Sequence, residues 1–467
     1  MDFLIVLGAL CFLMLVAYRG YSVILFAPIA AMGAVLLSDP ALVAPMFTGL
    51  FMDKMVGFLK LYFPVFLLGA VFGKLIEISG FSKSIVAATI RVVGAQRAML
   101  AIVLVCALLT YGGVSLFVVV FAVYPFAAEL FRQGDIPKRL IPGTIALGAF
   151  TFTMDALPGT PQIQNIIPTA FFGTSAWAAP VLGTLGGVFI LVVGMLYLEW
   201  RRRAAHRAGE GYGDAAALLN EPAPFAGDRL AHPLVSLLPL LMVGLSNLVF
   251  TRLIPLLYGD SYEFIPAVVG NAAPVVQEVP KIAAIWAVQG ALLVGIATIL
   301  LFAWKPVIAS FAEGTKNAIG GALLASMNTA SEYGFGAVIA ALPGFLVVAN
   351  ALAAIPNPLV NEAVTVTALA GITGSASGGM SIALAAMADT FIANANAAGI
   401  PMEVLHRVAS MASGGMDTLP HNGAVITLLA VTGLTHRQAY KDIFAITLIK
   451  TAAVFVIIGL FYATGLV

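Results

Sequence analysis

Long apolar runs alternate with short polar turns along the whole chain. The N-terminal run reaches Ala17 and lacks the basic start of a secretory signal, so we expect a retained first helix. The remaining pattern predicts an all-α polytopic membrane protein, with shorter apolar runs gathered around two polar motifs. Runs of about 20 residues or more, the length that crosses a bilayer, lie at 57–77, 178–200, 232–256, 281–303, 306–328, 334–355 and 442–466.

Composition supports the membrane assignment. Hydrophobic residues make up 61% of the chain and charged residues only 10%, which is too little polar surface to cover a soluble globule. The lipid bilayer is therefore the expected environment, and a length of 467 residues allows roughly ten to fourteen passes. A net charge of +1 argues against a nucleic-acid partner. No Gly-Lys-Ser/Thr phosphate loop occurs, so an ATP-driven pump is unsupported, and we expect neither a cofactor nor a metal.

One long polar segment divides the chain. Residues 201–231 begin with Arg201, Arg202 and Arg203 directly after an apolar run. Because basic residues stay on the cytoplasmic side, we expect this segment to be a cytoplasmic linker. It separates a first half, 1–200, from a second half, 232–467.

The two halves share motifs in the same order, which indicates an internal repeat. GGVS at 112–115 reappears as GGMS at 378–381, and MDALP at 154–158 reappears as MDTLP at 416–420. Because Gly and Pro interrupt helices, each half is expected to contain a re-entrant hairpin followed by a broken helix. The expected hairpins span about 101–131 and 364–397, and the expected broken helices span about 140–175 and 403–433.

Such breaks indicate a binding cavity. Irregular backbone at membrane depth persists only where it is buried in protein or faces a wet cavity. The helix after each hairpin tip aims free N–H groups and the positive end of its dipole at that cavity, which suits a carboxylate. Neither motif contains Arg or Lys. Anion recognition is therefore expected to depend on helix ends and neutral donors, which favours a small monocarboxylate.

The hairpins, the breaks and the segment LPGTPQ at 157–162 together resemble the gluconate permease (GntP) family of the ion-transporter superfamily. The resemblance implies inverted-topology repeats, a dimerising scaffold domain and a transport domain that moves as an elevator. It also implies that the chain is no enzyme, but a multi-pass inner-membrane symporter that couples protons to gluconate or short hydroxy acids. The first break lacks the His- and Pro-rich character of gluconate carriers, and the tips lack the Ser-Asn-Thr of sodium-dicarboxylate carriers. These departures favour the branch of the family that resembles 3-hydroxybutyrate permeases.

Asp155 and Asp417 are the candidates for proton coupling, with His421 beside the second, because an intramembrane carboxylate is costly when charged. Capping of a half-helix is the structural alternative for each aspartate, as is a plain hydrogen bond for His421. The substrate-binding candidates are the small and polar residues at the tips and breaks, and helix capping explains several of them equally well. They are Gly113, Ser115, Gly159, Thr160, Gln162, Asn165, Ser375, Ser377, Gly378, Ser381, Thr418, His421 and Asn422.

Other functions stay open at this point. A sodium-coupled or exchange carrier would use the same donors. An intramembrane aspartyl protease would also place two aspartates in the membrane, but it has no need of matched helix breaks, and no Gly-x-Gly-Asp occurs. A passive channel would be expected to carry a ring of charged residues, which the sequence does not indicate.

Overall fold

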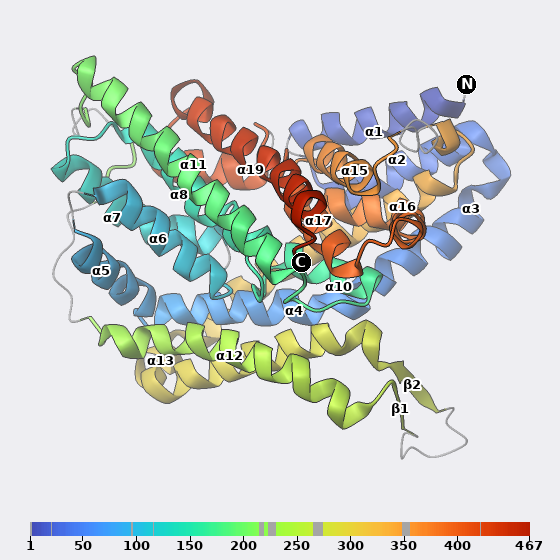
Figure 1. The fold of residues 1–467 in the computed structure, drawn as a ribbon, viewed down its shortest axis with the longest axis horizontal. Coiled ribbons are helices and arrows are strands. Elements are labelled where there is room, and N and C mark those ends of the chain that lie inside the picture. The colour runs from blue at the N-terminus through green and yellow to red at the C-terminus, as the bar shows by residue number, and fades with distance from the viewer. Residues whose placement is uncertain are drawn as a thin grey trace.

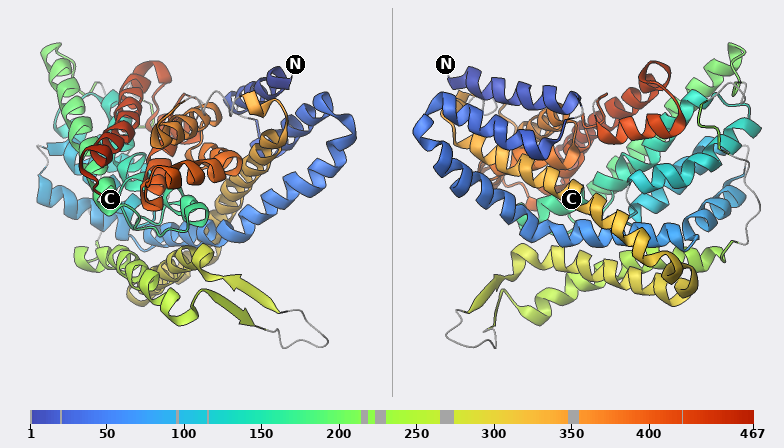
Figure 2. Two further views of the ribbon diagram at one scale, coloured as in Figure 1. Left: turned by 45° about the vertical axis from the view of Figure 1, so that its right-hand side comes forward. Right: turned by 180° about the vertical axis from the view of Figure 1, so that it is seen from behind.

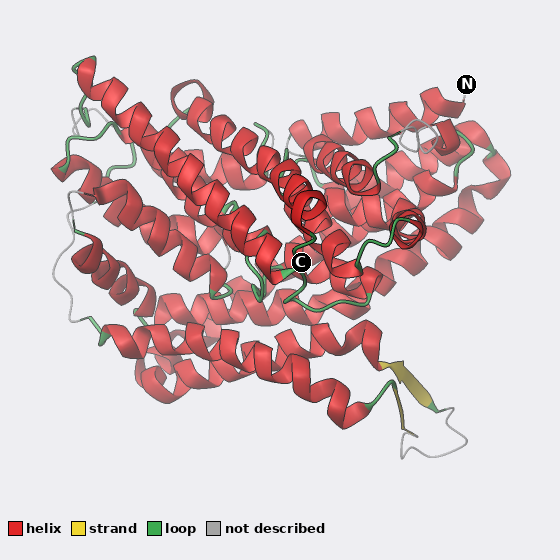
Figure 3. Ribbon diagram, in the orientation of Figure 1, coloured by secondary structure: helices red, strands yellow, loops and turns green. Residues whose placement is uncertain are grey.

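The computed structural model describes residues 2–19, 21–94, 97–114, 116–213, 219–222, 230–264, 274–347, 355–420 and 422–467. This part of the chain is mostly helical (Figure 3). Six described helical segments are long and apolar enough to cross a membrane, fewer than the roughly ten to fourteen passes that length allows. They are Pro40–Ile78, Pro180–Arg207, Pro233–Tyr258, Val279–Ala341, Ala376–Ala397 and His436–Thr464.

The N-terminal helices form one side of the molecule (Figure 1). The first helix occupies the expected run, and it packs along the second. A π-helical segment then leads without a loop into the long helix α4, which packs extensively on α13. The elements are α1 (Asp2–Tyr18), α2 (Val23–Ser38), η1 (Pro40–Leu42), α3 (Val43–Pro45), η2 (Met46–Phe51) and α4 (Met52–Ile78).

The rest of the first half consists of shorter helices and one long one. Residues 98–133 form two helices around the Gly112–Gly113 turn, and residues 141–172 form helices interrupted at 150–151 and 156–162. The elements are α5 (Phe81–Val93), α6 (Ala98–Tyr111), α7 (Leu116–Gln133), η4 (Lys138–Leu140), α8 (Ile141–Ala149), α9 (Phe152–Asp155), α10 (Ile163–Phe172) and α11 (Pro180–Arg207).

The segment between α12 (Pro233–Tyr258) and α13 (Val279–Ala341), inside the second half, corrects the all-α expectation. Strands β1 (Ser261–Phe264) and β2 (Val275–Glu278) form a small antiparallel sheet there. Half of the strand residues are aromatic or β-branched, which favours paired extended backbone over helix. Helix α13 departs from helical geometry at Ala303, and Figure 2 shows its two arms running in different directions.

The second half ends with the counterparts of the first-half hairpin and break. Residues 358–397 form two helices around Gly374 and Ser375, and residues 402–432 form two helices separated at 414–422. The elements are α15 (Pro358–Thr373), α16 (Ala376–Ala397), α17 (Met402–Ser413), α18 (Gly423–Thr432) and α19 (His436–Thr464).

The broken helices are too short to span a membrane individually. Helices α8 and α10 have 9 and 10 residues, and α17 and α18 have 12 and 10. Each is therefore roughly 14–18 Å long, at 1.5 Å per residue, against a hydrocarbon core of about 30 Å. Two such pieces in series would place the break between them near the middle of the bilayer.

Large apolar side chains on the outside of the helices fit a lipid environment. Leu241 and Leu256 of α12 are 65% and 82% exposed, and Leu301 of α13 is 77% exposed. In water such an exposed surface would be unfavourable, whereas hydrocarbon solvates it without cost. The faces of α12 and α13 that carry these residues are therefore suited to contact lipid.

Candidate functional site

Each broken helix is joined to the hairpin tip of its own half by a side-chain amide. Gln162, which precedes α10, donates from Nε2 to the carbonyl oxygens of Thr110 at 2.7 Å and Val114 at 3.3 Å. Asn422, which precedes α18, donates from Nδ2 to the carbonyl oxygen of Gly374 at 2.8 Å. Tip and break therefore form one packed unit in each half, and in both halves a side-chain amide donates from the break to a carbonyl oxygen of the tip.

Asp155 carries a buried carboxylate whose hydrogen-bonding capacity is not filled. It ends α9, is 2% exposed, and its Oδ1 has no hydrogen-bond partner. A Cβ atom added to Gly414 would overlap Oδ2. The carboxylate of the first break therefore lies directly against the backbone of the second.

Arg407 reaches from α17 of the second half into the first break. The side chain is fully buried, and Nη1 donates to the backbone oxygen of Asp155 at 2.9 Å and to Asn165 Oδ1 at 3.0 Å. Nη2 donates to the backbone oxygen of Ala178 at 2.7 Å, and Nε has no partner. All three acceptors are neutral oxygens, so no direct ion pair joins the guanidinium to the Asp155 carboxylate.

His406 stands beside Arg407, and both of its ring nitrogens have side-chain partners. Its Nε2 lies 3.2 Å from Asn165 Oδ1, and its Nδ1 lies 2.7 Å from Thr174 Oγ1. Asn165 Oδ1 is an acceptor because the amide nitrogen of that residue already donates to the carbonyl oxygens of Thr160 and Ala176. Nε2 therefore donates to Asn165, and Nδ1 pairs with the threonine hydroxyl.

Lys450 of α19 bridges the breaks of the two halves. Its Nζ donates to Asp417 Oδ1 at 2.5 Å and to the backbone oxygen of Phe150, just before α9, at 3.0 Å. Both members of the ion pair are buried. Asp155 adjoins this pair, because Arg407 donates to its backbone oxygen and its carboxylate lies against Gly414 of the second break. Two carboxylates and two cations thus form one buried cluster at the meeting point of α9, α17 and α19.

The second hairpin tip is built from small and hydroxyl residues. Ser375 caps α16, its Oγ accepting from the backbone N–H of Gly378 at 3.0 Å, and Ser377 Oγ lies 3.2 Å from Thr329 Oγ1 on α13. Ser381 is fully buried, and its hydroxyl has no hydrogen-bond partner. The tip therefore packs against α13 through polar groups that are only partly satisfied.

Comparison with known proteins identifies the class of protein. No established family profile matches the chain. An uncharacterized transporter of Bacillus subtilis (strain 168), YxjC, is 59% identical over 475 residues, covering all of both chains. The chain belongs to the same transporter family as YxjC. The buried charge cluster is thus part of a multi-pass membrane transporter.

A solved structure supports the fold of this transporter. The crystal structure of the YdaH transporter of Alcanivorax borkumensis, described as having an unusual topology, aligns with a TM-score of 0.54. The alignment covers 92% of this chain and 90% of that one, at 16% sequence identity. At that identity the likeness is one of fold.

The predicted site residues differ in what the structure shows of them. Ser115 and His421 lie outside the described residues. Neither aspartate is a helix N-cap, because Gln162 and Asn422 hold those positions. Asn422 fills the capping role left open for it: its Oδ1 accepts from the backbone N–H groups of the first turn of α18 at 2.7 and 3.0 Å.

The remaining candidates contact the protein itself. Gly113, Gly159, Thr160 and Asn165 pack within the first break and its tip, and Thr418 Oγ1 lies 2.6 Å from Thr447 Oγ1. Gly159 has a φ of 79°, and a Cβ atom there would overlap Trp177. Only glycine therefore allows the first break to approach that ring so closely.

The expectation of neutral donors alone left out two cations, because Arg407 and Lys450 reach the breaks from other helices. Sequence reasoning missed both residues, together with His406. A signal was present in each case: His406 and Arg407 stand together among apolar residues of α17, and Lys450 is a single cation within an apolar stretch of α19. An isolated charge in such a helix is expensive and usually functional.

Beyond the cluster, the described part of the linker is fastened by ion pairs. Glu221 pairs with Lys138 at 2.7 Å and with Arg132 at 2.8 Å, and Tyr212 donates to it at 3.0 Å. Burial alone would raise the pKa of Glu221, but these three partners outweigh burial and lower it below the ordinary 4.5. The linker carboxylate is thus held ionised against the end of the first hairpin.

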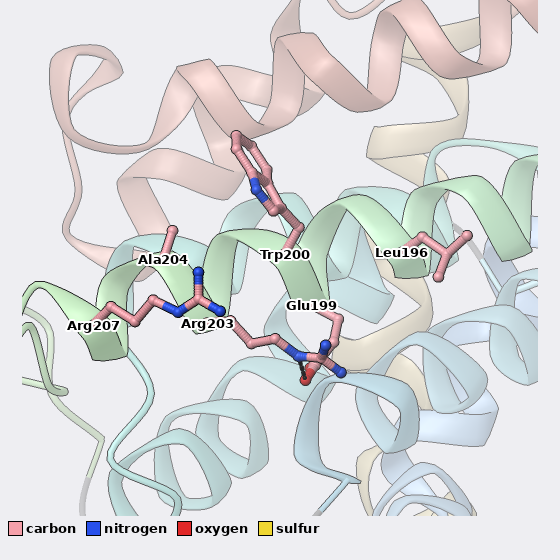
Figure 4. A pocket seen from close by; sticks show the side chains of 6 residues that line it. All are labelled: Leu196, Glu199, Trp200, Arg203, Ala204 and Arg207. Atoms are coloured by element: carbon pink, nitrogen blue, oxygen red, sulfur yellow. Dashed lines mark hydrogen bonds and ion pairs between the residues drawn. The ribbon is translucent and has the colours of Figure 1, made fainter.

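A surface hollow on α11 is lined by none of the residues of the charge cluster (Figure 4). The first residues of α11 contact the first break, since a Cβ atom at Gly183 would overlap the backbone oxygen of Ala156. Helix α11 still contacts Leu157 at Gly187, and the hollow starts at Leu196, roughly 14 Å further along the helix axis. We therefore do not assign it to the substrate. Its lining residues are Leu196, Glu199, Trp200, Arg203, Ala204 and Arg207.

Among the described residues, no group of three or more His, Cys, Asp or Glu side chains is placed to hold a metal ion.

Proposed function

We propose that this transporter is a secondary active symporter that couples one proton to one small organic monocarboxylate, such as 3-hydroxybutyrate or gluconate. The substrate binds where the two breaks meet. The observation that carries the proposal is the buried cluster formed by Asp155, Asp417, Arg407 and Lys450.

Charge balance links the proton to the substrate. With both carboxylates and both cations ionised, the formal charge of the cluster is zero. A carboxylate entering alone would leave an uncompensated buried charge, which costs several kcal/mol. If a proton neutralises Asp417, the ammonium group of Lys450 loses its partner and can bind the substrate carboxylate. Proton and anion then enter together, and the cluster stays neutral.

The same balance selects the class of substrate. A monocarboxylate requires one proton, whereas a dicarboxylate would require two neutralised side chains around two cations. Hydroxyl groups on the acid would find partners in the neutral side chains at the tips, among them the unpartnered hydroxyl of Ser381. Short hydroxy acids and sugar acids therefore fit the site better than multiply charged substrates.

The remaining features of the proposal follow the resemblance to the gluconate permease family. They are inner-membrane localisation, a homodimer, inverted repeats and elevator motion. We assign the scaffold to α4, α12 and α13, which pack together along one edge of the molecule (Figure 1). Hairpins and broken helices would then form the moving part. Crosslinking between copies through exposed positions of α12 tests this assignment.

Uptake into sealed liposomes tests the proposed coupling. One proton with one monoanion carries no net charge. An acidic exterior should therefore drive concentrative uptake, and a potassium diffusion potential at equal pH should not. A panel of gluconate, 3-hydroxybutyrate, lactate and citrate identifies the substrate. Uptake driven by a sodium gradient instead would favour a sodium-coupled carrier, uptake that never exceeds equilibration would indicate a channel, and peptide cleavage would indicate a protease.

Neutralising variants test the two aspartates. Asp155→Asn and Asp417→Asn should each abolish proton-driven accumulation, while counterflow exchange survives in Asp417→Asn because Lys450 stays free to bind the anion. Asp389→Asn, at an exposed position of α16, is the matched control. Normal accumulation in both break variants would remove proton coupling from these positions.

A further inference from the structure

The described structure contains a further buried carboxylate, outside the charge cluster, at the second hairpin tip. Glu332 of α13 is 4% exposed, and its Oε2 is buried without a hydrogen-bond partner. A Cβ atom added to Gly378 would overlap Oε2. The carboxyl group thus lies against the backbone of the first turn of α16, and glycine at 378 is what allows it to approach so closely.

The surroundings of Glu332 offer no cation to balance an ionised carboxylate. Helices α2 and α10, which pack on α13, carry no charged side chain. On α4, Asp53, Lys54 and Lys60 are exposed, and Lys74, which lies against Gly314 of α13 eighteen residues before Glu332, pairs with Glu77. The buried hydroxyl of Tyr62 donates to a backbone oxygen of α10 instead.

The other two helices packed on α13 offer no counter-ion to Glu332 either. Asp389 is the acidic residue of α16, and it is exposed, as is Arg252 of α12. No ion pair of the described residues includes Glu332. Ser331, next to Glu332 in the chain, and Ser381, three residues beyond Gly378 on α16, have buried hydroxyls without partners.

We propose that Glu332 is a proton-binding site that controls the second hairpin tip. An ionised, unpaired carboxylate at this interface would cost several kcal/mol, whereas the neutral acid fits. The packed tip seen here therefore holds the protonated form. Separation of α16 from α13 exposes the carboxyl to water, and the proton leaves to water. Release of the proton in turn keeps the tip open.

This site deepens the proposed function, on which it rests for the role of the tip in substrate access. The empty carrier must close the same tip to return across the membrane as the loaded carrier does. Glu332 therefore takes up a proton in both directions and adds nothing to the net stoichiometry. Its signature is a pH dependence of tip opening that persists without substrate and without a pH gradient.

The test uses the full-length, substrate-free transporter in liposomes. Ser377→Cys, in a background with Cys11 and Cys106 replaced by alanine, reports tip opening through its alkylation rate. The same reporter combined with Glu332→Gln corrects for ionisation of the thiol, and Asp389→Asn on α16 is the matched control. At pH values where the water-exposed carboxyl is ionised but the tip is still mostly closed, the corrected rate should rise about tenfold for each pH unit, because opening releases one proton. Glu332→Gln keeps the tip closed throughout.

A corrected rate that does not change with pH would overturn the proposal. If Glu332→Gln does not fold, infrared spectra of the wild-type protein still test it, since the band of protonated carboxyl groups must decline over the pH range in which alkylation accelerates. Constant intensity there would also refute the site. Neither readout uses substrate, so a failure of proton-driven uptake would sink the proposed function without altering this result.

Discussion

Replacing Lys450 with methionine removes one partner of the ion pair that joins the two breaks. The side chains of Lys450 and Asp417 are 2% and 11% exposed, so water does little to screen the charge left behind. Removing one partner of a buried pair costs about 3–5 kcal/mol. The methionine also leaves the backbone oxygen of Phe150 without its donor. We expect Lys450→Met to lower the free energy of unfolding by at least that amount.

Unfolding of the purified transporter in detergent measures this effect. Lys441→Met is the matched control, because Lys441 is an exposed lysine on the same helix, and it should change stability by less than about 0.5 kcal/mol. The double variant Lys450→Met, Asp417→Asn removes both charges. It should regain most of the stability, because an uncharged pair leaves no uncompensated charge in the interior.

Transport measurements on the same variants distinguish a loss of stability from a loss of anion binding. The double variant should be well folded yet bind anions poorly, because it lacks the cation that receives the substrate. The reasoning would be refuted if Lys450→Met were as stable as the control, or if the double variant were less stable than the single one. Either result would mean that the pair does not act as a buried, mutually compensating unit.

Three further predictions follow from contacts of individual residues. Gly414→Ala should reduce uptake at least about tenfold, because its Cβ atom would overlap the Asp155 carboxylate; normal initial rates would contradict this. Gln162→Leu and Asn422→Leu should each destabilise the protein by about 1–3 kcal/mol, because buried carbonyl oxygens of the tips lose a side-chain donor. Unchanged thermal unfolding would show that these amides do not hold tip and break together. Because the pKa of Glu221 is lowered in the folded protein, its ion pairs stabilise the protein above pH 4.5, and this stability is lost as the pH falls through the lower folded pKa. Glu221→Gln should therefore flatten the acid side of a plot of unfolding free energy against pH. An unchanged plot would exclude this contribution of the linker.

The sequence was sufficient to predict features that depend on local chemistry. Apolar runs and composition led to a helical membrane protein, and its relation to YxjC supports a transporter. Both motifs stand at helix ends in the structure, because proline removes a backbone donor and glycine accepts a left-handed φ, as at Gly159. These are properties of a few neighbouring residues. Substrate, coupling ion and inverted orientation remain predictions.

The composition of the candidate site was decided by tertiary structure. Asp155 and Asp417 were visible as motif residues, but Arg407 and Lys450 lie within helices whose local pattern assigns them no particular partner. Lys450 contacts a carbonyl oxygen 300 residues away, and Arg407 contacts one 252 residues away. Periodicity and propensity describe neighbours along the chain, whereas a buried charge is stabilised by whatever donors and acceptors the packing of distant helices brings to it.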